Sequence, residues 1–343
     1  MRNILNIFNI NLILGFLYFV PYTQVNAQKV VDSTLESKEF TSLEEALINP
    51  NQVYRLNLSN QDSITFPNNI WTKFENIEYL SLKNDHLNAI PSGIGNLKNL
   101  KVLDLSGNDF KLLPQTFTGL ENLREIYLND EVEMDVNQSL NTIKKLPNLK
   151  VLHLENDNLK KIPTSLLDFT QLEALYLDSN RFKKLPDNIW SKFENLEYLS
   201  LKNDHLDKIP SGIGNLKNLK ILDLSGNDFN LLPQTFTGLE NLREIYLNDE
   251  NKMDVNQSLS TIKDLPNLKV LHLENDNLKK VPPSLLNLTQ LEAIYLNKNS
   301  FNKIPLELRE LKNLNLIDLH DNTYKLNVQD LQAKDGFGFK IRI

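Results

Sequence analysis

The sequence predicts an α/β solenoid, with a parallel β-sheet on one face and short helices or turns on the other. Three observations predict this fold: a leucine pattern recurs about every 23 residues, two leucines in each unit are separated by one residue, and a proline follows at a fixed distance. A unit of this length cannot bury its apolar face alone and must stack on its neighbours.

An internal duplication accompanies the short repeat. Residues 68–162 recur as residues 187–281, offset by 119 residues, with 83 of 95 aligned positions identical. Twelve units are found between residues 53 and 322, and their lengths are 23 or 24 residues except for two units of 26 residues. Because a solenoid grows by adding neighbours, one domain of this length needs no single large core.

Each unit predicts one strand and one return segment. Side chains alternate along a strand, so two leucines separated by one residue face the same side. A proline such as Pro91 or Pro210 follows and ends the strand pairing, because proline has no N–H to donate. Apolar residues three apart, such as Ile94 and Leu97, then indicate a short helix or helical turn.

The complete pattern LxxLxLxxNxLxxIPxxIxxLxN is nearly intact in the unit that begins at Leu196. It resembles the repeat of the leucine-rich-repeat family, in the form found in exported bacterial proteins. The resemblance implies a horseshoe of about 12 repeats, with the parallel sheet on its concave face. It also implies that ligands meet this concave face.

The first 27 residues have the features of a secretory signal peptide. They contain one charge, Arg2, an apolar run from Ile10 to Val20, and small residues before a predicted cut after Ala27. The apolar run is shorter than the roughly 17 to 25 residues that span a membrane. We therefore expect a mature chain without a membrane span, secreted or held at the cell envelope or surface.

The predicted solenoid has a cap at each end. Ser42 and Glu45 have the spacing of a capping box, which predicts a helix from Ser42 to Ile48. The last residues are too few for a second domain and are predicted to cover the open edge of the last strand. The expected segments are a signal peptide at 1–27, an N-terminal cap at 28–52, the solenoid at 53–322 and a C-terminal cap at 323–343.

Composition and motifs argue against chemistry. The chain has no cysteine, which excludes disulfides, thiolate metal sites and a cysteine nucleophile. Its net charge of −7 gives no indication of nucleic-acid binding. It contains no HExxH motif, glycine-rich phosphate loop or nucleophile elbow. We therefore predict no enzyme activity, no cofactor and no metal.

Aromatic residues mark two places on the predicted concave face. At the outward position between the strand leucines, the sequence places a first cluster of Tyr127, His153 and Tyr176 and a second cluster of Tyr246, His272 and Tyr295. Adjacent strands lie about 4.8 Å apart, so the members of each cluster should be neighbours. Tyrosine is enriched at binding hot spots, and a neighbouring imidazole can donate, accept or stack.

Charged residues flank both clusters. Arg124 and Arg243 lie on one side, and Glu155 and Glu274 lie on the other. This arrangement favours a polar protein or peptide partner, with a surface glycan as a further possibility. The alternative interpretation is that the aromatic rows only stabilise the sheet face.

The position after each strand, usually asparagine in the family, is mixed in this chain. Its residues are Gln61, Asp85, Asn108, Glu131, Asp157, Asn180, Asp204, Asn227, Glu250, Asp276, Asn299 and Asn322. An ionised carboxylate can only accept hydrogen bonds, so we expect each acid to accept two turn N–H groups. The other interpretation is calcium, which takes several oxygen ligands. Its ligands would be Asp157, Glu155 and the acidic stretch of Asp130, Glu131, Glu133 and Asp135. In the second copy Lys252 replaces Glu133, which argues against this interpretation.

The two 26-residue units predict a longer helix on the convex side. Both contain the sequence MDVNQSL, and Val136, Leu140 and Ile143 keep the apolar spacing of a helix. An extended loop is the alternative.

The leading functional prediction is a non-catalytic, exported recognition or adhesion protein that binds a protein or surface ligand through its concave face. One alternative is an envelope scaffold or self-associating structural protein. Another is an intracellular signalling scaffold, which would apply if residues 1–27 are not removed.

Overall fold

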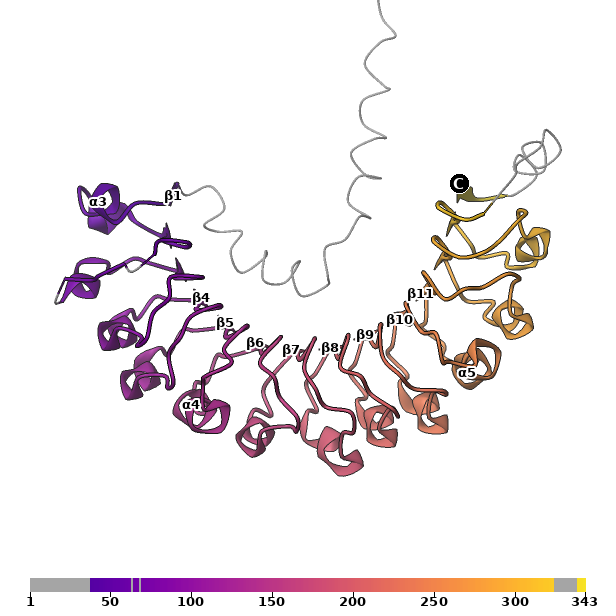
Figure 1. The fold of residues 1–343 in the computed structure, drawn as a ribbon, viewed down its shortest axis with the longest axis horizontal. Coiled ribbons are helices and arrows are strands. Elements are labelled where there is room, and N and C mark those ends of the chain that lie inside the picture. The colour runs from indigo at the N-terminus through magenta and orange to yellow at the C-terminus, as the bar shows by residue number, and fades with distance from the viewer. Residues whose placement is uncertain (1–37, 63, 68, 324–337) are drawn as a thin grey trace, which may run out of the picture.

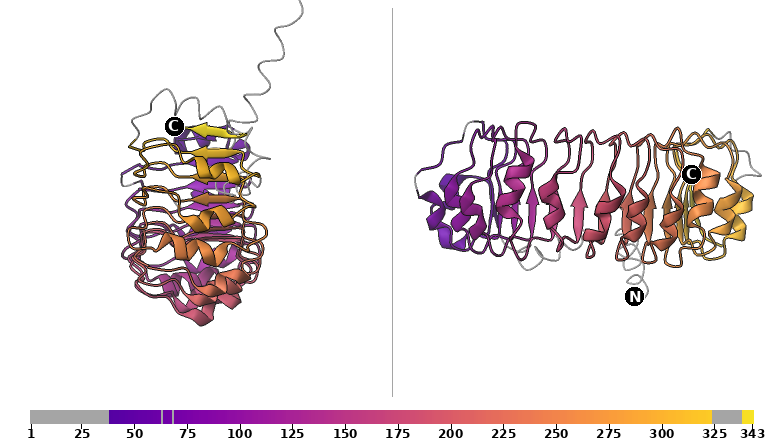
Figure 2. Two further views of the ribbon diagram at one scale, coloured as in Figure 1. Left: turned by 90° about the vertical axis from the view of Figure 1, so that its right-hand side faces the viewer. Right: turned by 90° about the horizontal axis from the view of Figure 1, so that it is seen from below.

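The computed structural model describes residues 38–62, 64–67, 69–323 and 338–343. Within these ranges fourteen strands form one sheet in sequence order, and every neighbouring pair is parallel. The strands line the inner side of an open arch, and the helices lie along its outer side (Figure 1; Figure 2). The predicted solenoid is therefore confirmed.

The strands are short because the chain turns away soon after each pair of inward leucines. They are β1 Glu39–Phe40, β2 Arg55–Asn57, β3 Tyr79–Ser81, β4 Val102–Asp104, β5 Glu125–Tyr127, β6 Val151–His153, β7 Ala174–Tyr176, β8 Tyr198–Ser200, β9 Ile221–Asp223, β10 Glu244–Tyr246, β11 Val270–His272, β12 Ala293–Tyr295, β13 Leu316–Asp318 and β14 Lys340–Arg342.

Most return segments on the convex side are 3-10 helices that begin directly after a proline. Those after a proline are η3 Ser92–Asn96, η4 Gln115–Gly119, η5 Thr164–Asp168, η6 Asp187–Lys192, η7 Ser211–Asn215, η8 Gln234–Gly238, η9 Pro283–Asn287 and η10 Leu306–Glu310. The two others, η1 Pro50–Gln52 and η2 Ile70–Lys73, follow Asn49 and Asn69. The α-helices are α3 Leu43–Ala46, α4 Val136–Ile143 and α5 Val255–Ile262.

The core runs continuously between the sheet and the convex helices. Strand leucines such as Leu80 and Leu103 pair across adjacent strands and are fully buried. The convex side contributes large side chains, including Trp190 and Phe236. Each large buried side chain stabilises the fold by about 1.5 to 3 kcal/mol, and every unit depends on its neighbours for that burial.

The longer convex helices were predicted and are confirmed. In α4 the Asp135 carboxylate accepts a hydrogen bond from the backbone N–H of Gln138 at 3.0 Å, and Asp254 caps α5 in the same way at 2.9 Å. The extra residues of the two 26-residue units therefore form helix instead of a loop. Val136 and Leu140 of α4 are buried in the core.

The N-terminal helix is shorter than predicted. Ser42 does accept a bond from the backbone N–H of Glu45, but α3 ends at Ala46 and not at Ile48. The Glu45 carboxylate pairs with Lys38 instead of closing the capping box. Because Pro50 starts the next turn and has no N–H, the helix has little room to continue.

The other terminal predictions are only partly described. At the C-terminal end, β14 pairs with β13 and extends the sheet by one strand. The predicted signal peptide at 1–27 lies outside the described residues, as do parts of both predicted caps.

Side chains at the position after each strand form a hydrogen-bonded ladder. From Gln61 to Asp276, the backbone N–H of each ladder residue donates to the side-chain oxygen of the next, over 2.7 to 3.3 Å. Where asparagine occupies the position, its amide also donates to two carbonyls. Asn108, for example, donates to Leu82 at 2.8 Å and Leu105 at 2.6 Å.

The ladder acids correct one expectation, because each accepts one turn N–H and not two. Their second oxygens are buried without a hydrogen-bond partner among the described residues: those of Asp85, Glu131, Asp157, Asp204, Glu250 and Asp276. By repeat position, this oxygen takes the place of the asparagine amide, which faces carbonyl groups. A protonated carboxyl could donate there, whereas a carboxylate could not.

Burial accordingly favours the neutral acids. It raises the pKa of Asp157, Asp204 and Asp276 to about 8 and that of Glu131 and Glu250 to about 9. Burial therefore favours the protonated form of these carboxyls, which is the form in which the second oxygen could donate as the asparagine amide does.

Candidate functional site

The two predicted clusters form two ring stacks on the concave side of the sheet. In the first, Tyr127 of β5, His153 of β6 and Tyr176 of β7 occupy matching positions on adjacent strands. The His153 ring lies 3.9 Å from Tyr127 and 4.1 Å from Tyr176, with interplanar angles of 14° and 11°. The expectation that these residues are side-by-side neighbours is confirmed.

The second cluster repeats this geometry. The His272 ring lies 3.9 Å from Tyr246 and 4.3 Å from Tyr295, with interplanar angles of 14° and 3°. Its strands β10, β11 and β12 pair in the same register as β5, β6 and β7. Strands β8 and β9 lie between the two clusters, and their buried side chains Tyr198 and Ile221 connect Tyr176 of the first cluster to Tyr246 of the second in one apolar group.

Each imidazole is also held at its edge by two carboxylates. His153 Nε2 lies 3.1 Å from Glu125 Oε1, and Nδ1 lies 3.3 Å from Glu155 Oε2. The matching distances from His272 are 2.9 Å to Glu244 and 3.2 Å to Glu274. Both histidines therefore direct their ring nitrogens to groups of the protein itself.

These contacts favour the charged imidazolium. Burial alone would lower the pKa of His153, but the hydrogen bond to Glu125 and the nearby carboxylate of Glu155 outweigh burial and raise that pKa to about 9. The pKa of His272 is raised by the same kind of contacts. The His272 cation in turn lowers the pKa of Glu244, although burial opposes this.

Sequence reasoning missed Glu125, Glu244 and Tyr198. Glu125 and Glu244 lie two residues before Tyr127 and Tyr246 on the same strands, and Tyr198 lies on the strand next to that of Tyr176. All three face the same side of the sheet as the clusters. Tyr198 of β8 extends the first stack, with its ring 4.6 Å from that of Tyr176. The alternation of side chains along a strand was the signal that could have identified all three.

Exposure separates the predicted site residues into two groups. His153 and His272 are only 6% and 2% exposed, and Tyr176 is buried as well. Tyr127, Tyr246 and Tyr295 are partly exposed, and Arg124 and Arg243 are exposed. The accessible part of the site therefore consists of tyrosine edges and arginines. Each histidine is buried between two tyrosine rings and holds them in place.

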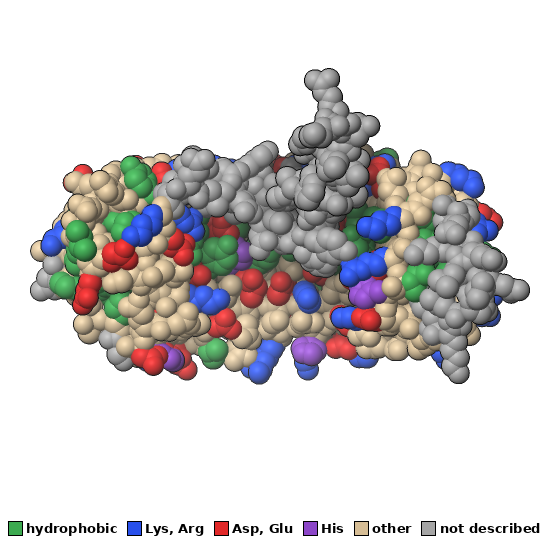
Figure 3. Space-filling model, turned by 90° about the horizontal axis from the view of Figure 1, so that it is seen from above, with side chains coloured by type: hydrophobic (Ala, Val, Ile, Leu, Met, Phe, Trp, Pro, Cys, Tyr) green, Lys and Arg blue, Asp and Glu red, His purple; other side chains and the backbone are tan. Residues whose placement is uncertain are grey.

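The charged flanks are partly neutralised by internal pairs. Glu155 and Glu274 hold the imidazoles, as described above, while Lys150 pairs with Glu173 at 3.3 Å and Lys269 with Glu292 at 3.0 Å. The concave side shows acidic, basic and histidine side chains interspersed with hydrophobic ones (Figure 3). Within the described residues, no group of three or more His, Asp or Glu side chains is arranged to hold a metal ion.

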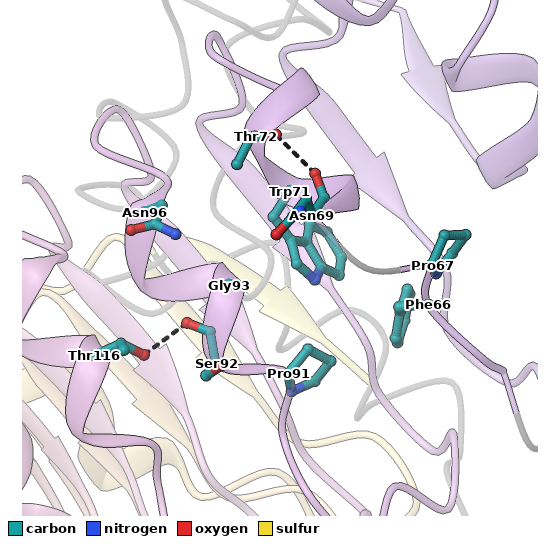
Figure 4. A pocket seen from close by; sticks show the side chains of 10 residues that line it. All are labelled: Phe66, Pro67, Asn69, Trp71, Thr72, Pro91, Ser92, Gly93, Asn96 and Thr116. Atoms are coloured by element: carbon teal, nitrogen blue, oxygen red, sulfur yellow. Dashed lines mark hydrogen bonds between the residues drawn. The ribbon is translucent and has the colours of Figure 1, made fainter.

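Pockets lie along the return segments. One of about 360 Å³ lies between η2 and η3, beside Phe66, Trp71 and Pro91 (Figure 4). Hydrogen bonds from Thr72 to the Asn69 carbonyl and from Thr116 to the Ser92 carbonyl support its walls. No residue of either cluster lines it. None of the helices within the described ranges has the length and apolar character needed to cross a membrane.

Two stretches of the chain match family models. Residues 75–131 match a model described as leucine rich repeat, and residues 190–265 match one described as leucine-rich repeat region. A probable disease resistance protein of Arabidopsis thaliana is 31% identical over 94 residues, which make up 27% of this chain. The match spans only about a tenth of that curated relative's length.

Solved structures share the architecture over most of the chain. An internalin from Listeria monocytogenes aligns with a TM-score of 0.59 and 21% identity, over 88% of each chain. A leucine-rich-repeat protein from Leptospira interrogans aligns with a TM-score of 0.56 and 24% identity, over 89% of this chain and 100% of the other. At these identities the likeness concerns the fold.

Proposed function

Because this chain is a leucine-rich-repeat protein, we propose that it is a non-catalytic recognition protein that binds a protein or peptide through the concave face of its sheet. The fold supports a protein-interaction role in general. The concave site is the finer proposal and rests on the two ring stacks.

One observation carries this proposal: the same stack occurs twice with nearly the same geometry. Both stacks hold their central imidazole between two tyrosines and two carboxylates, so the partly exposed tyrosines have little freedom. A rigid aromatic edge loses little conformational entropy on binding. Exposed Arg124 and Arg243 beside the stacks supply the second residue type that is common at hot spots.

We further propose that the protein acts outside the cytoplasm, secreted or at the cell envelope. This part rests on the charge, apolar run and small residues of positions 1–27 alone. Sequencing the N-terminus of the protein from its native source tests it, and a retained Met1 would contradict it.

Affinity capture from envelope and external-medium extracts tests the concave site. The test variant changes Tyr127, Tyr246 and Tyr295 to Ser and leaves both histidines in place, since those are buried. A matched control changes Lys145 and Lys263 to Glu, because both are exposed on the convex side. Near-native circular dichroism is required of each variant before capture.

We expect a protein that is captured by the unchanged chain and the control but lost with the tyrosine variant. A partner retained equally by all three chains would place recognition elsewhere on the molecule. The absence of any captured protein from either extract would contradict the recognition proposal itself.

A further inference from the structure

A turn in the first copy carries unbalanced negative charge around an exposed apolar side chain. Val132 is 57% exposed, and its neighbours Asp130 and Glu133 are exposed as well. We refer to residues 130–135 as the acidic turn. In the second copy Asn251 and Lys252 replace Val132 and Glu133.

The second copy shows how this charge can be neutralised within one chain. Lys252 Nζ lies 2.7 Å from Asp228 Oδ1, which forms an ion pair across the same turn. In the first copy the matching residues are Glu133 and Asp109, both acids. That pairing is therefore absent. Asp109 contacts His86 Nδ1 at 3.2 Å instead, and no ion pair is found for Glu133 among the described residues, so the exposed carboxylate of Glu133 stands beside Val132 without a cation.

The next two units carry the opposite charge. Five exposed cations follow the strands β6 and β7, and no side-chain hydrogen bond or ion pair is found for them among the described residues: Lys160, Lys161, Arg181, Lys183 and Lys184. Two of these lysines, Lys161 and Lys184, frame a pocket of about 380 Å³. Ile162, Leu167 and Ile189 give the pocket a mostly apolar lining.

Both features lie on the same edge of the solenoid. The acidic turn begins beside the ladder residue Glu131, and the cationic segments begin after the ladder residues Asp157 and Asn180. Ladder hydrogen bonds join these three residues in succession. The edge is thus negative with a protruding apolar side chain in one unit, and positive with an apolar pocket in the following two.

We propose that two copies of this chain associate along this edge about a two-fold axis, each placing its acidic turn over the lysine-framed pocket of the other. A two-fold arrangement forms both contacts at once and closes the assembly as a dimer. Val132 would enter the apolar pocket, and Glu133 would approach Lys161 and Lys184. This association is independent of recognition at the concave face.

Sedimentation velocity of the purified protein, from low micromolar to several hundred micromolar, tests the proposal. We expect a reversible monomer–dimer equilibrium that weakens as salt is added, because exposed charges are screened. A chain that remains a monomer throughout this range would overturn the proposal, and would leave an acidic segment of another protein as the occupant to consider.

Charge reversal then tests the contact itself. Val132→Asn with Glu133→Lys gives the first copy the turn of the second, a sequence that the fold already accommodates. Lys161→Glu with Lys184→Glu reverses the pocket. We expect each variant to weaken the dimer at least about tenfold, as expected for a lost or reversed charge pair.

Mixing the two variants provides the decisive arm. In the mixed dimer the turn with Glu133→Lys faces the pocket with Lys161→Glu and Lys184→Glu, so opposite charges meet again. At the second contact, the unaltered turn of the pocket variant faces the unaltered pocket of the turn variant. We expect the mixture to form dimers although neither variant does so alone. The matched control, Lys280→Glu with Lys303→Glu, changes the equivalent lysines of the second copy and should leave the dimer intact. A mixture that stays monomeric, or a control that loses the dimer, would contradict this interface.

Discussion

The first and second clusters contain the same rings and the same carboxylates, yet they end differently. After Tyr176 the first stack continues to Tyr198, whereas the residue at the same register beside β12 is Leu316. The Glu125 side chain is 5% exposed, against 24% for Glu244. Repeated sequence reproduces the ring geometry, while neighbouring units determine how deeply each stack is enclosed.

The ladder shows the same distinction between repeated sequence and position. Asp85 and Asp204 occupy equivalent places in the two copies, and each accepts one backbone N–H at 2.7 Å. Burial nevertheless raises the pKa of Asp85 only to about 6, and that of Asp204 to about 8. Asp85 lies nearer the N-terminal end of the solenoid, and Asp204 lies near its middle. A ladder acid in the middle of the solenoid therefore has the higher pKa and favours its protonated form more strongly.

The largest expected effect is a loss of stability as pH rises. The ladder acids have higher pKa values in the folded protein than in the unfolded chain, where the pKa is near 4. Their contribution to stability is therefore complete below about pH 4 and is lost as pH rises through the folded pKa values of about 6 to 9. We expect the free energy of unfolding to fall by several kcal/mol between pH 5 and pH 8. Urea unfolding across this range measures it, and a flat or rising profile would contradict protonated ladder acids.

Asparagine substitution compares the two ladder positions directly. At pH 8, Asp204→Asn should stabilise the protein by about 2 kcal/mol and Asp85→Asn by about 1 kcal/mol. The order follows from their pKa values, because the more strongly shifted acid is more costly to ionise. Urea unfolding of both variants at pH 5 and pH 8 checks this, and equal gains would remove the distinction between end and middle.

Truncation of one core leucine should cost a comparable amount in both copies. Leu82 and Leu201 occupy equivalent inward positions and are fully buried. Each change to Ala should lower the free energy of unfolding by about 2 to 5 kcal/mol, through lost burial and a residual cavity, so this range overlaps the ladder effects. A loss under about 0.5 kcal/mol, typical of surface sites, would contradict the assigned strand register.

The histidines should differ modestly. His153→Gln leaves Glu125 buried without its cation and should cost about 2 kcal/mol at pH 7, against about 1 kcal/mol for His272→Gln, because Glu244 is more exposed. The raised pKa of His153 means that this contribution is complete below about 6.5 and is lost as pH rises through about 9. The double variant His153→Gln with Glu125→Gln should recover stability, and no recovery would show that charge pairing is unimportant.

The smallest effect concerns the end of each stack. Tyr198→Leu gives the first stack the neighbour that the second has, and should cost about 0.5 to 1 kcal/mol in unfolding free energy. The reverse change, Leu316→Tyr, tests whether a fourth ring can be gained. Thermal unfolding of both variants distinguishes a contribution of ring stacking from that of apolar burial. If Tyr198→Leu leaves the unfolding free energy unchanged, apolar burial alone accounts for the contribution of Tyr198.

The repeat period predicted most of the fold, because it fixes which residues point inward. The leucines at positions 80, 103 and 201 could be assigned to the core from spacing alone, and the stacked rings followed from one outward row. Glu125 was missed because only one of the two outward positions in each strand was considered. Each ladder acid accepts only one hydrogen bond because its second oxygen faces carbonyl groups, which cannot donate. The spacing of residues in the sequence does not show which backbone groups surround that oxygen.

The arrangement of strands also has a mechanical consequence. Strand-to-strand hydrogen bonds and ladder bonds both run along the arch, so a pull on its two ends loads the units in series. Each unit then bears the same force and adds its own small extension. The arch should therefore flex as a compliant spring, whose weakest interface between units sets the force at which it opens.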